Sequence, residues 1–145
     1  MPSLKVLTLK NLEMDENHCR VLDAFSRPDL EIVLRSCKVT SAGANALVEI
    51  LGRNQGPTKL DLCEIDNFVL ANGLRGNSRL KSWRPRISNN VEVGNRELLA
   101  IAGAVYENKG LVDFNLSCYG FRVDDVTWGA ICDSLKTHPT LEVLN

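Results

Sequence analysis

The sequence predicts an α/β solenoid in which about five strand-then-helix repeats follow one another along a right-handed superhelical arc. Two observations predict this fold. A leucine pattern typical of short strands returns at intervals of 23 to 31 residues, and the segments between carry apolar residues at helical spacing. Strands joined in this way lie parallel, with the sheet on the concave face and the helices on the convex face. We therefore expect one domain over residues 1–145.

The predicted strands follow an L-x-x-L-x-L skeleton, in which the apolar residues point inward and the residues between them point outward. Their central inward positions are Leu7, Ile32, Leu60, Trp83, Phe114 and Leu144. Pro85 stands where the third leucine of the fourth strand belongs. Because proline cannot donate a backbone hydrogen bond, we expect a break or a bulge in that strand at this point.

The segments between the strands predict amphipathic helices. In the last one, Trp128, Ile131, Cys132 and Leu135 share one face after Asp124, whose carboxylate can cap the helix. Shorter helices are predicted around Leu22 and from Asn67 to Leu74. Two further helices are expected to bury Ala44, Leu47, Ile50 and Leu51 after a cap at Thr40 or Ser41, and Leu98, Leu99, Ala102, Val105 and Tyr106 after a cap at Asn95.

Composition excludes several classes of function. With 17 basic and 18 acidic residues, a net charge of −1 and no block of like charges, the chain is not expected to bind nucleic acid or an anionic membrane. No apolar stretch approaches the roughly 18 residues needed to span a bilayer. The N-terminus does not resemble a secretory signal. The 5 cysteines lack a C-x-x-C pair and are interpreted as reduced, small buried or half-buried residues. These features favour a cytoplasmic location.

The tightest sequence pattern runs from Leu30 to Leu51. It combines a strand leucine, a cysteine at the following turn and a helix start of small residues. Together with the repeat length, it resembles the ribonuclease-inhibitor-like subfamily of leucine-rich repeats, as found in NOD-like receptors and in intracellular proteins of microbial eukaryotes. The resemblance covers essentially the whole chain and implies a protein-binding arc. At the turn where the family has Asn or Cys, other segments hold Leu12, Ile65, Ser88 and Tyr119, so we expect an incomplete polar ladder.

No catalytic constellation is recognisable. His18 and His138 are the only histidines and are interpreted as exposed or turn-forming residues. Asp124 and Asp125 are better explained by helix capping than by acid–base chemistry. No phosphate-binding loop or metal-binding motif occurs, so we expect neither an enzyme nor a cofactor. Trp83 and Trp128 are interpreted as core residues rather than as stacking platforms for bases.

The outward strand residues are predicted to form the surface that binds another protein, whose identity the sequence does not reveal. Arg35, Asp61, Arg84 and Arg86 are the candidate partner-binding residues, because arginine offers a rigid fork of donors and is enriched at interfaces. The column after the last strand leucine is predicted to be Lys10, Arg35, Cys63, Arg86 and Ser117. The alternative interpretation of this basic line is a solvated face with local charge pairing.

The predicted function is a protein–protein interaction module, a scaffold or sensor part of a larger intracellular protein. Two alternatives are a GTPase-activating arc, as in the Ran-activating family, where Arg84 and Arg86 would be tested first, and the substrate-recognition part of a ubiquitin ligase. Because the sequence starts and stops beside predicted strands, we expect a fragment of a longer array, incomplete at both ends. Such uncapped ends predict self-association.

Overall fold

The computed structural model describes residues 3–116 and 122–144. These residues form an α/β structure with 7 strands and 5 helices. The strands are β1 (Val6–Lys10), β2 (Glu13–Met14), β3 (Glu31–Val39), β4 (Lys59–Cys63), β5 (Ser82–Arg84), β6 (Asp113–Phe114) and β7 (Val143–Leu144). The helices are α1 (Glu16–Phe25), α2 (Ser41–Gly52), α3 (Asn67–Leu74), α4 (Val91–Glu107) and α5 (Asp125–Lys136).

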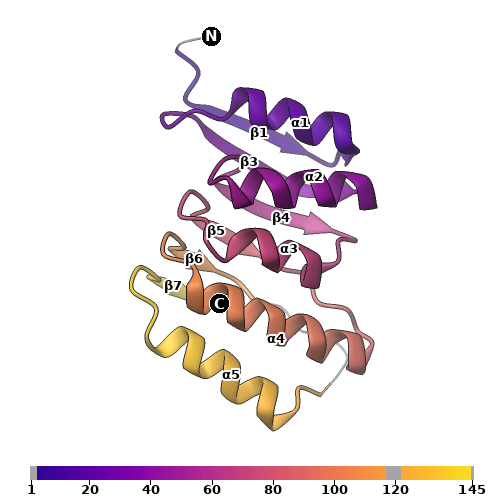
Figure 1. The fold of residues 1–145 in the computed structure, drawn as a ribbon, viewed down its shortest axis with the longest axis vertical. Coiled ribbons are helices and arrows are strands. Elements are labelled where there is room, and N and C mark those ends of the chain that lie inside the picture. Colours follow the sequence, from indigo (N-terminus) through magenta and orange to yellow (C-terminus); the bar gives the residue numbers. More distant parts are fainter. Residues whose placement is uncertain (1–2, 117–121, 145) are drawn as a thin grey trace.

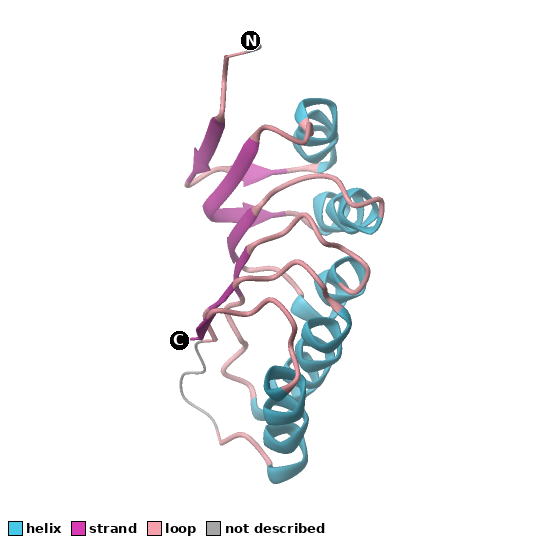
Figure 2. Cartoon of the chain, turned by 90° about the vertical axis from the view of Figure 1, so that its left-hand side faces the viewer, coloured by secondary structure: helices cyan, strands magenta, loops and turns pink. Residues whose placement is uncertain are grey.

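Sheet order follows chain order. The strands lie in the order β1-β3-β4-β5-β6-β7, all neighbouring pairs are parallel, and β2 pairs with the second half of β3. Each helix packs beside the next helix along the chain (Figure 1). Figure 2 shows the strands on one side and the helices on the other. The sheet therefore has one face covered by helices and one face free of them, which we call the open face.

The core lies between the sheet and the helix layer. Ile32, Leu34, Leu60, Trp83 and Phe114 supply its strand side, and each is at most 2% exposed. The rings of Trp83 and Phe114 lie 5.8 Å apart on neighbouring strands. Burial of one such side chain stabilises the fold by about 1.5–3 kcal/mol. The inward positions predicted for these strands are confirmed.

Helix starts follow side-chain capping. Oδ1 of Asp124 accepts from the backbone N–H of Thr127 at 2.7 Å, which confirms this predicted cap. The cap predicted at Asn95 is wrong, because α4 begins at Val91 and is capped by Asn90. Asn95 lies inside the helix, and its Oδ1 accepts from the N–H of Asp124 at 3.2 Å.

The predicted inward face of α5 is only partly correct. Ile131 is 3% exposed, whereas Trp128 is 56% exposed. Cys132 is also exposed, contrary to prediction. The buried stripe of α5 is formed by Thr127, Ile131 and Ser134, and at 100° per residue Trp128 lies about 60° beyond its edge at Ile131. Leu99 and Tyr106 of α4 are likewise exposed, because the buried stripe there passes through Leu98, Ile101, Ala102 and Val105.

β5 ends at Arg84, immediately before Pro85, so the strand break predicted at the proline is confirmed. The two shorter helices are also confirmed, since α1 has 10 residues and α3 has 8. Among the described residues, no helix combines the length and apolar character that crossing a membrane requires.

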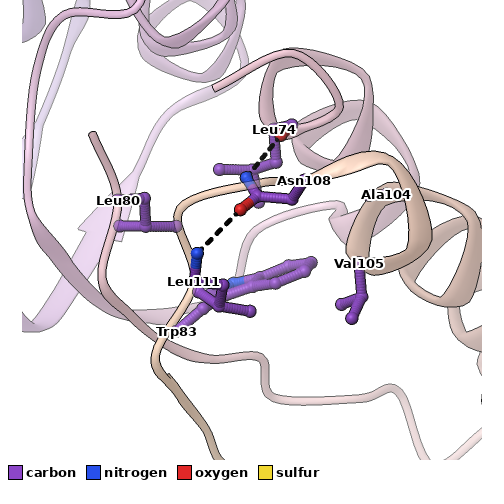
Figure 3. A pocket seen from close by; sticks show the side chains of 7 residues that line it. All are labelled: Leu74, Leu80, Trp83, Ala104, Val105, Asn108 and Leu111. Carbon is purple, nitrogen blue, oxygen red and sulfur yellow. Dashed lines mark hydrogen bonds between the residues drawn. The ribbon is translucent and has the colours of Figure 1, made fainter. Parts of the chain in front are cut away.

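Buried polar side chains hold the loops that return from one helix to the next strand. Asn108 is 2% exposed; its Nδ2 donates to the carbonyl of Leu74 at 2.8 Å and also to that of Asn77. Its Oδ1 accepts from the N–H groups of Gly110 and Leu111, both at 2.9 Å. Figure 3 shows the bonds of Asn108 with Leu74 and Leu111. One carboxamide thus joins the end of α3, its own loop and the start of the next strand.

The same position is polar in the neighbouring loops. Asn77 donates from Nδ2 to the carbonyl of Leu51 at 2.9 Å and accepts from the N–H of Leu80 at 2.8 Å. In the last described loop, Nδ1 of His138 accepts from the N–H of Leu141 at 3.1 Å. The polar ladder was predicted in the turns that follow the strands, and this row of Asn77, Asn108 and His138 was not predicted.

A second link between loops is the guanidinium of Arg79. It donates from Nε to the carbonyl of Gly56 at 2.7 Å and from NH2 to the carbonyl of Leu30 at 2.8 Å. Desolvation lowers the pKa of this group below its usual value. Three successive return loops are therefore joined by one side chain.

Candidate functional site

The register of the sheet places three of the four candidate residues in one row on the open face. Leu34 of β3 pairs with Leu60 of β4, so the next residues, Arg35 and Asp61, also pair. Asp61 in turn pairs with Arg84 of β5. Since neighbouring strands lie about 4.8 Å apart, Arg35 and Arg84 flank Asp61 at about 10 Å from each other.

This register corrects the predicted column. The structural row is Lys10, Arg35, Asp61 and Arg84. The predicted column instead contains Cys63 and Arg86, and its last member, Ser117, lies outside the described residues. The predicted column assumes that Leu34 pairs with Leu62, but in the structure Leu34 pairs with Leu60. Leu62 pairs instead with Cys37, which follows a bulge at Ser36, where φ is 53°. A shift of two residues leaves each side chain on the correct face but in the wrong row.

Arg86 joins the row from beyond the end of β5. Its Nε donates to Oδ1 of Asp61 at 3.0 Å, and its NH2 lies 3.5 Å from Oγ of Ser36. The hydrogen bond with Asp61 raises the pKa of the Arg86 guanidinium. The Asp61 side chain is only 19% exposed, whereas that of Arg86 is 47% exposed. Arg86 therefore lies back across β4 instead of extending freely from the broken strand.

All four candidate residues line one hollow of about 470 Å³ on the open face. The other lining residues are Val33, Leu34, Ser36, Lys59, Leu60, Ser82, Asp113 and Asn115. The structure thus brings the predicted residues together and adds Lys59 and Asp113 to them.

The loop that carries Arg86 is held from the helix side. Nδ2 of Asn67 donates to the carbonyl of Arg86 at 2.8 Å, and Oε2 of Glu97 accepts from the N–H of Ser88 at 3.0 Å. Asn67 is 0% exposed and Glu97 is 5% exposed. Desolvation raises the pKa of Glu97, while the hydrogen bond from Ser88 opposes the rise. Neither Asn67 nor Glu97 was predicted, although a polar side chain among the apolar residues of a helix face was the signal available.

The charges of the open face are unequally paired. Lys59 contacts Glu31 at 2.7 Å, and Arg86 contacts Asp61. Arg35 and Arg84 are exposed, and their guanidinium groups make no hydrogen bond or ion pair with any described residue. The row consequently presents two unpaired guanidinium groups on either side of a paired carboxylate.

The histidines lie in structural positions. Nδ1 of His18 lies 2.8 Å from Oδ1 of Asp15 in the capping box of α1, and the side chain is exposed. His138 belongs to the return-loop row described above. Residues 3–116 and 122–144 contain no group of three or more His, Cys, Asp or Glu residues that could hold a metal ion.

No family model matches this sequence, and no curated protein is significantly similar to it. A proposal about function therefore depends on the geometry of the open face.

Proposed function

We propose that this chain is a protein-interaction module of the ribonuclease-inhibitor-like leucine-rich repeat kind and that it binds its partner through the open face. The repeat assignment is supported by the match between chain order and sheet order, with one helix between successive main strands. It is also supported by the inward leucines at matching register positions. A scaffold or sensor part of a larger cytoplasmic protein fits this role.

One observation carries the proposal. The open face holds a continuous row of charged side chains across β1, β3, β4 and β5, and the helix layer covers only the opposite face (Figure 2). Outward strand residues are released from core packing, so a partner can be recognised there without any cost to the fold. The hollow of about 470 Å³ gives room for partner side chains.

The test is alanine scanning of both faces against a partner identified by affinity capture. We expect Arg35→Ala and Arg84→Ala each to weaken binding by about 2 kcal/mol or more if they lie at the centre of the interface. Lys136→Ala on α5, which is exposed on the helix side, is the control and is expected to leave affinity unchanged. Loss of binding in the control with intact binding in both row variants would overturn the proposal.

We rank the GTPase-activating and ubiquitin-ligase alternatives below binding alone. An arginine that acts on a nucleotide in a partner must be presented to it, whereas Arg86 is held by Asp61 at 3.0 Å. Arg84 remains exposed and would be the residue to test for that activity. No specific observation on the open face favours substrate selection for ubiquitin transfer over binding in general.

Self-association is a separate proposal about the sheet edges. Val143 and Leu144 of the edge strand β7 are 44% and 55% exposed, and Val6 of the other edge strand β1 is 49% exposed. Exposed apolar edge strands can pair with another chain. Light scattering over a range of concentrations tests this, and a strict monomer at high concentration would count against it.

A further inference from the structure

We propose that the row of Arg35, Asp61, Arg84 and Arg86 is a carboxylate-recognition site, which takes an acidic segment of a partner protein. This inference rests on the proposed function and names the chemistry of the partner. In the site, Arg35 and Arg84 bind the incoming carboxylates. The Asp61 carboxylate already accepts a hydrogen bond from Arg86, so it competes with the incoming carboxylates for that guanidinium.

The first argument is the charge left on the open face after its internal pairs are formed. Glu31 and Asp61 each have a basic partner, at 2.7 and 3.0 Å, whereas Asp113 is bonded to Ser82 and has no basic partner among the described residues. Arg35 and Arg84 have no acidic partner among the described residues and are exposed. A ligand of opposite charge can therefore contact both guanidinium groups without first breaking an ion pair.

The second argument is geometric. A guanidinium offers a planar fork that binds a carboxylate through two parallel hydrogen bonds. Arg35 and Arg84 stand about 10 Å apart in backbone position, because one strand lies between them. Two acidic residues on the same side of an extended segment are about 7 or 13 Å apart, and the length of an arginine side chain covers that range. A segment with several acidic residues can engage both.

The third argument is that the site already holds a carboxylate. Asp61 lies between the two free arginines, is only 19% exposed and accepts a hydrogen bond from Arg86. The backbone of the Arg86 loop is fixed independently by Asn67, through a bond of 2.8 Å. Removal of the Asp61 charge is therefore expected to free the Arg86 side chain while its loop stays in place.

The same acidic residues argue against a nucleic acid. Asp61 and Asp113 both line the hollow, and Oγ of Ser82 donates to Asp113 at 3.2 Å. A phosphate backbone carries closely spaced charges and would be repelled by these carboxylates. Separate carboxylates on a peptide can be placed on the two arginines and avoid the acidic positions.

The experiment measures fluorescence anisotropy of a labelled peptide of alternating Glu and Ser, long enough to cross three strands. A peptide of alternating Gln and Ser is the neutral control. We expect the Glu peptide to bind, the Gln peptide not to bind, and added salt to weaken binding. Arg35→Gln and Arg84→Gln are each expected to weaken binding about tenfold, the loss typical of a charge-assisted contact.

Two further variants separate local recognition from overall charge. Lys136→Gln on α5 changes the net charge by the same amount as Arg84→Gln and should leave binding unchanged. Asp61→Asn is expected to tighten binding, because it removes the competing anion. The changed side chains are at or near the surface, so circular dichroism should show that every variant is folded.

Several results would overturn the proposal: equal binding of the two peptides, equal loss in Arg84→Gln and Lys136→Gln, or weaker binding in Asp61→Asn. Tighter binding of an oligouridine than of the Glu peptide, lost in Arg84→Gln, would assign the row to nucleic acid instead. If the Glu peptide does not bind but Arg35→Gln and Arg84→Gln still abolish binding of the partner protein, the carboxylate-recognition proposal is wrong and the proposed function stands. If row variants leave partner binding intact, the proposed function falls as well.

Discussion

The substitution Asn108→Ala tests how much the fold depends on the return-loop row. It removes a carboxamide that satisfies two carbonyl groups, those of Leu74 and Asn77, and two N–H groups, those of Gly110 and Leu111. All four bonds are buried, and the surrounding apolar side chains leave no room for a ligand in the wild-type packing (Figure 3). The Leu74 carbonyl also accepts from the backbone N–H of Asn77, so three buried groups are left without a partner. At about 1 kcal/mol for each of these groups, the free energy of unfolding should fall by about 3 kcal/mol.

Urea denaturation followed by circular dichroism measures this loss. With a slope of about 2 kcal/mol per molar urea, the midpoint should fall by about 1.5 M. The matched control is Asn45→Ala, the same chemical change at an exposed position of α2. Its midpoint should change by no more than the equivalent of about 0.5 kcal/mol.

A second variant distinguishes the two halves of the carboxamide. Asn108→Asp keeps an oxygen that can accept from Gly110 and Leu111, but at neutral pH it directs negative charge at two carbonyl groups. We expect it to be at least as unstable as Asn108→Ala at neutral pH and to recover partly in acid. A midpoint of Asn108→Ala indistinguishable from that of Asn45→Ala would refute the reasoning.

Three other predictions follow from single positions. Burial lowers the pKa of His138 below its usual 6.5, so the folded state binds the proton more weakly than the unfolded state does. The free energy of unfolding is therefore expected to be highest above about pH 6.5 and to fall as the pH drops below that value. As the pH falls through this range, the denaturant midpoint should fall less in His138→Asn than in the wild type. Parallel plots of midpoint against pH for the two proteins would contradict this role of His138. In Gly110→Ala, the new Cβ would lie within contact of the Ser78 backbone, so a large loss of stability is expected, whereas Gly129→Ala in α5 meets nothing within 4 Å and should stabilise the helix by up to about 1 kcal/mol. Leu135→Ala should cost about 2 kcal/mol, near the low end for core leucines, because Leu135 is only partly buried, and an unchanged melting temperature would refute this packing.

The sequence predicts the strand cores well because side chains in strands alternate with a fixed period. Trp83 and Phe114 are apolar between polar neighbours, and each is buried as expected. The same periodicity cannot determine which strand residue lies beside which, because a shift of two residues preserves the alternation. Such a shift lies between β3 and β4, where Asp61 and not Cys63 pairs with Arg35.

Helix faces and buried amides were harder to predict, for different reasons. An apolar stripe of about 100° leaves its edges ambiguous, so Trp128 fits the pattern and is nevertheless exposed. Asn108 and Asn77 have the composition of ordinary loop residues, and only the packing of successive loops shows that they are buried. The position of Arg86 on Asp61 depends on a loop held by Asn67, a contact between residues 19 positions apart.

The link made by Arg79 changes how the chain is expected to lose its structure. In an array where each unit touches only its neighbours, units can melt one after another from either end. Arg79 reaches the carbonyl of Leu30, 49 positions earlier in the chain, as well as that of Gly56. Unfolding of any one of these three loops leaves the half-buried guanidinium of Arg79, or the carbonyl groups that it contacts, without a hydrogen-bond partner. The three loops are therefore expected to unfold together. Stepwise fraying should therefore begin at α5 and β7, beyond the reach of this side chain.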